Sequence, residues 1–311
     1  MAARALERAT LAAGSAVNRV LPARAPERPA SGMLCLSDRI RLLRATIRNW
    51  PLVAVDRVGP RGLVVTYRTA AGDRVRCRAR STDLFETVLV SSGYDYPAEF
   101  LGLDRPGDPM VVVDAGAHIG TFLLYVRSLL GDRDFTGIAI EPMAATFALL
   151  EQNCWLNGLT GVHLVQAALA AGPGTAVLRT DVPPDGAYLH PAGSPAPASG
   201  RGELVDTVEL GALCADLGVT EVTLLKLDIE GSEYDVLDAS WPFLVERVRT
   251  LVMEVHELPD GRGLHTVTRR LAPAFEVTVV QRGPGGGVLV AHRRGSGTAD
   301  VGDGSEGPRP V

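Results

Sequence analysis

Short continuous apolar runs alternate with helical stretches in the part of the chain that starts at Met110. The seven runs cover residues 110–113, 137–140, 162–165, 176–179, 222–227, 250–255 and 275–280. Strands of a parallel sheet are covered by helices on both faces, so their sequences are continuously apolar and do not alternate. The pattern therefore predicts a doubly wound α/β sheet within residues 110–294.

The stretch before Met110 has a different pattern and predicts a small N-terminal helix and hairpin subdomain at 37–109. Its expected elements are a helix at 37–50 ended by Pro51, a hairpin of strands 62–67 and 74–80 around the turn 70–73, and a helix at 82–91 capped by Thr82 or Asp83. Three other segments lack periodicity. We expect a partly disordered leader at 1–36, a flexible Pro/Gly/Ser/Ala insert at 183–202 and a disordered tail at 295–311.

Composition narrows the class of protein. Hydrophobic residues make up 46% of the chain and charged residues 22%, which is the ordinary range of globular proteins. The net charge of −5 and the 5% of aromatic residues argue against a nucleic-acid partner, which needs a basic face or stacking platforms. No apolar run approaches the length of a membrane helix, and the four cysteines form no Cys-x-x-Cys pair. We therefore expect a cytoplasmic protein with free thiols and no membrane partner.

A glycine loop follows the first apolar run. Asp114 ends the run, Gly116 permits a tight turn and close approach to a ligand, and Gly120 allows close packing where a helix begins. Ala117 and His118 lie between the two glycines, beside the free N–H groups of the helix start. The dinucleotide fingerprint Gly-x-Gly-x-x-Gly requires a second glycine where this chain has His118. The spacing disfavours a nicotinamide cofactor and suits a ligand without phosphates.

The next two strand ends complete a candidate nucleoside site. Glu141, followed by Pro142, can accept hydrogen bonds from both ribose hydroxyls; the alternative is a solvated carboxylate at a strand end. Gln166 and the small Ala167 follow the third run. They would leave room for an adenine ring, whose edge Gln166 can bond. Ligands of open parallel sheets bind beyond the carboxyl ends of the strands, so these residues are expected to face one crevice.

The segment 224–233 holds the chain's single lysine, Lys226. Side chains alternate along a strand, so Lys226 and Asp228 are expected on one face, with Asp228 pointing toward the crevice of Asp114. Glu230 and Glu233 follow, where a helix is predicted to begin. Such a dense set of charges must be paired or face a site. Lys226 is then expected to act as an internal counter-charge for the neighbouring carboxylates.

Glu254 and His256 share a face at the end of a later run. A histidine at a strand's carboxyl end can act as a general base, since its pKa lies near working pH. A partly buried structural histidine is the alternative. Asp228, Glu254 and His256 would also suit a magnesium or manganese ion.

Residues 60–290 resemble the FkbM family of methyltransferases. The resemblance lies in the glycine loop, in Ile140-Glu141-Pro142, in Asn157-Gly158 and above all in the Lys-x-Asp-x-Glu-Gly-x-Glu segment from Lys226 to Glu233. It implies a class I, Rossmann-like methyltransferase fold with a mostly parallel seven-stranded sheet whose seventh strand is antiparallel. It also implies S-adenosyl-L-methionine as cofactor and a hydroxyl acceptor on a sugar or secondary metabolite.

Residue roles follow from the same resemblance. Asp114, Gly116 and Gly120 would hold the methionine side of the cofactor, and Glu141 its ribose. Asp228 would lie where cofactor and acceptor meet.

A hydroxyl acceptor must lose its proton as it attacks, and the candidate base is Asp228 or His256. Lys226 is the third candidate catalytic residue. Tyr94 and Tyr96, with Glu230 and Glu254, are the expected lid or acceptor residues. The alternatives are a small-molecule N-methyltransferase, which needs no strong base, and a non-catalytic nucleoside-binding module. The expected partner is a small-molecule acceptor, and the N-terminal helix and hairpin would permit a homodimer.

Overall fold

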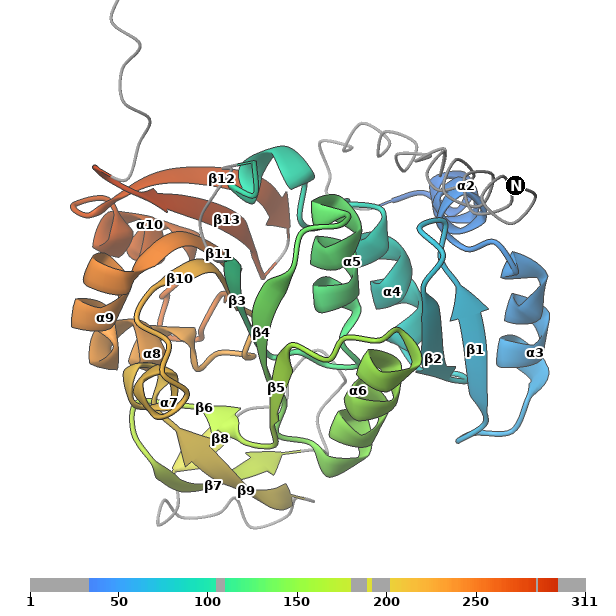
Figure 1. The fold of residues 1–311 in the computed structure, drawn as a ribbon, viewed down its shortest axis with the longest axis horizontal. Coiled ribbons are helices and arrows are strands. Elements are labelled where there is room, and N and C mark those ends of the chain that lie inside the picture. Colours follow the sequence, from blue (N-terminus) through green and yellow to red (C-terminus); the bar gives the residue numbers. More distant parts are fainter. Residues whose placement is uncertain (1–33, 105–109, 180–188, 192–201, 284, 296–311) are drawn as a thin grey trace, which may run out of the picture.

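A seven-stranded sheet forms the centre of the molecule in the computed structural model, which describes residues 34–104, 110–179, 189–191, 202–283 and 285–295 (Figure 1). Its strand order is β12-β13-β11-β10-β3-β4-β5, and all neighbours are parallel except β13, which is antiparallel to both β11 and β12. The strands are β3 (Met110–Ala115), β4 (Phe135–Ile140), β5 (Val162–Val165), β10 (Val222–Leu227), β11 (Val248–His256), β12 (Phe275–Gly283) and β13 (Gly286–Arg293). The predicted doubly wound, mostly parallel sheet is confirmed.

One apolar run was wrongly placed in this sheet. Residues 176–179 belong to β7 (Gly174–Arg179), which joins β6 (Ala168–Leu169), β8 (Leu189–Pro191) and β9 (Gly202–Val208) in a separate four-stranded sheet. A short apolar run looks the same in either sheet, because periodicity carries no information about the partner strand. The run pattern also missed β13, whose apolar stretch is short and follows two glycines.

Helices cover both faces of the large sheet. One face packs on α5 (Thr121–Leu130) and α6 (Ala144–Leu156). The other face packs on α7 (Leu210–Asp216), α8 (Glu233–Ala239), α9 (Trp241–Arg247) and α10 (Leu264–Leu271). Side chains alternate along β3, so Val112 packs against α5 and α6 on one face and Val113 packs against the helices on the other face. The strand ends are therefore fixed in position on both sides.

The N-terminal subdomain packs beside α5 and α6, at the right of Figure 1. Its elements are α2 (Leu36–Thr46), η1 (Trp50–Leu52), α3 (Val53–Val58), β1 (Val64–Arg68), β2 (Arg74–Arg78), α4 (Asp83–Ser91) and η2 (Ala98–Phe100). The predicted hairpin and second helix are confirmed. The first helix ends four residues before the predicted end, because Ile47 turns extended and forms a β-bridge with Thr69.

Two asparagines of the α6 region bind the outer edge of β2. The Asn157 side chain accepts from the Arg74 N–H at 2.9 Å and donates to the Arg74 carbonyl at 2.7 Å. Asn153 makes the same pair of bonds with Arg76, at 2.8 and 3.3 Å. These amides take the place of a neighbouring strand and hold the hairpin at a defined position against α6, which covers the large sheet.

The leader, most of the insert and the tail fall on residues outside the described ranges. Within the described residues, no helix is long and apolar enough to span a lipid bilayer. All four cysteines are free thiols, as expected.

Candidate active site

The carboxyl ends of β3 and β10 bring Asp114, Lys226 and Asp228 together. In the parallel pairing of the two strands, Lys226 lies opposite Asp114. The Lys226 ammonium is buried, 3.3 Å from Asp114 Oδ1 and 3.2 Å from Asp228 Oδ2, and it donates to the Gly116 carbonyl at 2.9 Å. The lysine is thus the counter-charge of two carboxylates, as the alternation along its strand predicted.

Burial and charge act in opposite directions on this cluster. Burial alone would lower the pKa of Lys226, but Asp228 and Asp114 outweigh it, so the pKa is raised and the ammonium stays charged. Burial raises the pKa of Asp114, and Lys226 partly opposes that shift. Both Asp114 oxygens are buried and accept no hydrogen bond from the described residues. Asp228 is the partly exposed carboxylate of the cluster, so it is the one that can accept a hydrogen bond from a bound molecule.

The glycines of the loop are required by close contacts within the protein. Gly116 has φ +75°, and a Cβ there would lie 1.8 Å from the Asp228 carbonyl oxygen, so the loops after β3 and β10 touch at this point. Gly120, at φ +87°, precedes α5, and a Cβ would lie 2.8 Å from Leu150 Cδ1. The predicted tight turn and close packing are both present. Ala117 is buried, and its N–H donates to the Ile140 carbonyl, so this residue supports the loop from behind.

Glu141 braces the same loop. Its Oε2 accepts the His118 N–H at 3.0 Å and its Oε1 accepts the Met143 N–H at 2.9 Å. Burial raises the pKa of Glu141, and these N–H bonds oppose the shift. Each oxygen retains a lone pair, so the carboxylate can also accept from a ligand.

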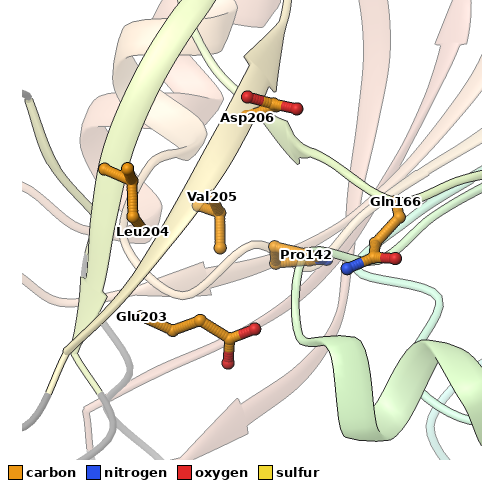
Figure 2. A pocket seen from close by; sticks show the side chains of 6 residues that line it. All are labelled: Pro142, Gln166, Glu203, Leu204, Val205 and Asp206. Carbon is orange, nitrogen blue, oxygen red and sulfur yellow. The ribbon is translucent and has the colours of Figure 1, made fainter.

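A pocket of about 270 Å³ opens between the loops that follow β4 and β5 and strand β9 (Figure 2). Pro142 and Gln166 form one wall, while Ala167 is buried and lies outside the lining. The other wall comes from residues 203–206 of β9. This wall was not predicted, because β9 follows the insert and its sequence carries no motif that relates it to the nucleoside site.

His118 links the glycine loop to the N-terminal subdomain. Its Nδ1 lies 2.8 Å from Glu86 Oε2 and its Nε2 lies 3.3 Å from Asp83 Oδ1. Burial would lower the pKa of His118, but the bonds to Asp83 and Glu86 raise it to about 10. The Asp83 carboxylate also accepts from the side chain of Arg78, at 2.8 and 2.9 Å, and from its backbone N–H at 2.7 Å. Of the two predicted caps, Thr82 occupies the N-cap position of α4, although no side chain makes a cap hydrogen bond. His118 is held as a cation on the protein.

The two tyrosines expected as lid residues are core residues. Tyr94 and Tyr96 are 3% and 2% exposed. Tyr94 packs in the core of the N-terminal subdomain, away from the strand ends. Tyr96 lies with its hydroxyl 3.5 Å from Asp228 Oδ2 and its ring edge on Phe122. Both tyrosines are buried in hydrophobic cores and so do not form the expected lid, although Tyr96 contacts a predicted catalytic residue.

A second cluster surrounds His256. Its Nδ1 lies 3.1 Å from Glu233 Oε1 and its Nε2 lies 3.4 Å from Glu230 Oε2. Burial would lower the pKa of His256, but Glu233 and Glu230 raise it to about 9. Burial and Asp228 raise the pKa of Glu230 to about 7, and the charge of Asp228 together with burial raises that of Glu254 to about 8. As long as His256 keeps its proton, it does not act as a base at neutral pH.

The structure changes the predicted metal set. Ligand atoms of Asp228, Glu230 and His256 lie within 4.8 Å of one another, and Glu254 is absent from this group. Glu254 and His256 share a face of β11, but the Glu254 carboxylate is not among the ligand atoms that converge there. Glu230 takes a left-handed backbone with φ +54°, in the turn before α8. Sequence analysis predicted a helix start at Glu230, whereas the helix starts at Glu233.

The strand order, with its antiparallel β13, and the glycine loop at the end of β3 define a class I methyltransferase. The model of the methyltransferase FkbM domain matches residues 114–276, and the chain belongs to this family. It is 31% identical over 191 residues to 31-O-demethyl-FK506 methyltransferase FkbM of Streptomyces tacrolimicus, covering 51% of this chain and 69% of the relative. It is also 31% identical over 183 residues to methyltransferase sdnD of Sordaria araneosa, covering 50% and 69%.

Among solved structures, methyltransferase FkbM from Methylobacillus flagellatus KT matches with a TM-score of 0.43 and 18% identity, over 64% of this chain and 47% of that chain. The family assignment makes this protein a methyltransferase enzyme, so the non-catalytic module is set aside.

Proposed function

We propose that the protein transfers a methyl group from S-adenosyl-L-methionine to a hydroxyl oxygen of a sugar or secondary-metabolite small molecule. The observation that carries the proposal is the buried Lys226 between Asp114 and Asp228, next to the glycine loop. The name of the Streptomyces relative describes an O-demethylated substrate, and this supports oxygen as the acceptor atom.

The residues at the strand ends fit the donor. When bound, S-adenosyl-L-methionine supplies a methyl group on a positively charged sulfur, which an attacking atom takes in a direct displacement. Lys226 lies 3.3 Å from Asp114 Oδ1 and fixes this buried carboxylate beside the glycine loop, and Glu141 has lone pairs for ribose hydroxyls. The pocket beside Pro142 and Gln166 offers space for the nucleoside end. The carboxylates at the strand ends also suit a cationic donor.

Asp228 is the residue we assign to the acceptor side. Its side chain is 26% exposed, so it is reachable, whereas Asp114 is fully buried. Lys226 and Tyr96 both approach Oδ2 and hold the carboxylate in one orientation. A hydroxyl oxygen that attacks the methyl carbon must lose its proton, and a positioned carboxylate assists that loss. Positioning supplies the rest of the rate, because methyl transfer is an in-line displacement.

An amine acceptor is the second candidate. Carboxylates outnumber cations around His256, and such a site attracts a positively charged acceptor. Acceptor panels of matched alcohols and amines separate the two functions, with the methylated atom identified by mass spectrometry.

Isothermal titration calorimetry tests the donor. We expect binding of S-adenosyl-L-methionine and of its demethylated product, and no binding of NAD. Asp114→Asn is expected to weaken donor binding, whereas Asp260→Asn, on an exposed loop, serves as the matched control. Binding of NAD alone, or of none of the three compounds, would overturn the proposal.

A further inference from the structure

We propose that Asp228, Glu230 and His256 bind a divalent cation at the open side of the cleft. Their side chains are 26%, 33% and 26% exposed, so an ion from solvent can reach all three. Their ligand atoms lie within 4.8 Å of one another. Neighbouring ligands of an octahedral ion with bonds of about 2.1 Å are about 3 Å apart, so side-chain shifts of up to about 2 Å would close the site.

His256 is oriented as a metal ligand by Glu233. Ligating histidines usually donate their second ring N–H to a carboxylate, which fixes the ring and the tautomer. Here Nδ1 faces Glu233 Oε1 at 3.1 Å, and this leaves Nε2 directed at Glu230. Glu233 is fully buried, and its Oε2 has no hydrogen-bond partner among the described residues. A buried carboxylate directed at the ring is the second observation that points to a ligand.

The remaining contacts leave ligand atoms for the cation. His256 Nε2 and Glu230 Oε2 are 3.4 Å apart, longer than a good hydrogen bond, so an ion between them would replace a weak contact. Lys226 and Tyr96 both approach Asp228 Oδ2. Asp228 Oδ1 is therefore the oxygen that would bind the cation.

Local charge favours the cation. Asp228, Glu230 and Glu233 gather around one histidine, and Lys226, which contacts Asp228, also contacts Asp114. Uncompensated carboxylates at a half-buried site are costly, and a divalent ion supplies the missing positive charge.

The donor set identifies the kind of ion. Two carboxylates and one imidazole suit Mn²⁺, which accepts both oxygen and nitrogen ligands, with Mg²⁺ as a weaker competitor. Three protein ligands leave half of an octahedron open, which suits an acceptor with two neighbouring oxygens. This last point rests on the proposed function, whereas cation binding itself does not.

Electron paramagnetic resonance of Mn²⁺ added to the chelator-treated protein tests the site, without donor or acceptor. We expect one bound ion per chain, seen as loss of the free-ion signal. Glu230→Gln and His256→Gln are expected to weaken Mn²⁺ affinity about tenfold or more, and Glu233→Gln about 10- to 100-fold. Glu254→Gln is the matched control, since Glu254 belongs to the same cluster but lies outside the ligand group. Its affinity should change by less than about tenfold.

Circular dichroism confirms that each variant is folded. Asp228→Asn provides a further ligand variant in case Glu233→Gln does not fold. Absence of Mn²⁺ binding to the unmodified protein would overturn the proposal and leave a protonated histidine between two carboxylates. A Glu254→Gln variant that loses affinity while Glu230→Gln keeps it would also overturn it. Donor binding is measured separately by calorimetry. If the protein binds Mn²⁺ but does not bind S-adenosyl-L-methionine, the proposed function is rejected and the cation site is not.

Discussion

His118 and His256 are each held between two carboxylates, yet the two regions differ in their charge balance. His118 faces two carboxylates of α4, and Arg78 supplies a second cation there. His256 faces two carboxylates of the turn and first residue of α8, and further acidic side chains adjoin it. In the first region two cationic side chains face the two carboxylates of α4, whereas in the second a single histidine faces two carboxylates.

The pKa values of the carboxylates differ between the two regions: they are lowered near His118 and raised near His256. Burial would raise the pKa of Asp83 and of Glu86, but bonds to His118, and for Asp83 to Arg78, outweigh it and lower both. Near His256, burial and like charge instead raise the pKa of Glu230 to about 7 and that of Glu254 to about 8. Paired charges of the first kind hold a structure together, whereas unbalanced charges of the second kind mark a site that binds something.

The largest expected effect concerns stability in the balanced region. Asp83→Ala removes a fully buried partner of Arg78 and His118, and we expect it to lower the free energy of unfolding by about 3 kcal/mol or more. Urea denaturation measures the loss. Glu86→Ala is the control, because that side chain is 42% exposed and should cost less. If Asp83→Ala lowered the free energy of unfolding no more than Glu86→Ala does, the stabilising role assigned to this region would be wrong.

The next effect concerns turnover in the acidic region. Asp228→Asn is expected to lower kcat about 100-fold, because a carboxylate that assists proton loss is worth about that factor or more. The urea midpoint should move little, since Asp228 is partly exposed. Asp260→Asn supplies the baseline rate. Full turnover by folded Asp228→Asn enzyme would contradict the catalytic assignment.

A pH series separates the two regions further. The pKa of His118 is raised from 6.5 to about 10, so its stabilising contribution is complete below pH 6.5 and is lost as pH rises toward 10. The groups facing it are Asp83, Glu86 and Arg78, with Glu141 on its backbone N–H. We expect His118→Gln to flatten the fall of unfolding free energy between pH 7 and 10.

The matched control for that series is the exposed His163 of β5. His163→Gln should leave the slope of stability against pH unchanged. A His118→Gln slope equal to that of the unmodified protein would show that this imidazolium contributes nothing.

The smallest effect provides the baseline for both histidines. His265 lies exposed on α10, outside either cluster. His265→Ala is expected to change the free energy of unfolding by less than about 0.5 kcal/mol. A larger change, measured by the same urea titration, would mean that histidine loss itself, and not loss of the carboxylate contacts, drives the other results.

The large sheet and one half of the site were predictable from the sequence. Buried parallel strands are continuously apolar, and their carboxyl ends lie at one edge, so Asp114, Glu141 and Asp228 fall near one another. Alternation placed Lys226 on the face of Asp228, and the structure confirms the contact at 3.2 Å.

The other half depends on features that periodicity does not encode. The contact of His118 with Asp83 joins residues 35 positions apart, and it forms only because the hairpin and α4 dock on α5 and α6. Glu230 reaches His256 from a left-handed backbone position, which is unusual for a glutamate and unmarked by its neighbours. Both contacts are products of tertiary packing.

The amide side chains on β2 have a consequence for solubility. An open strand edge invites pairing with a strand of another molecule, and a two-stranded hairpin has two such edges. On β2, Asn157, Asn153 and Asp83 take the outward N–H groups of Arg74, Arg76 and Arg78 in turn. That edge therefore has no free N–H row for an intruding strand. The side chains that hold the hairpin in place therefore also prevent the β2 edge from pairing with a strand of another molecule.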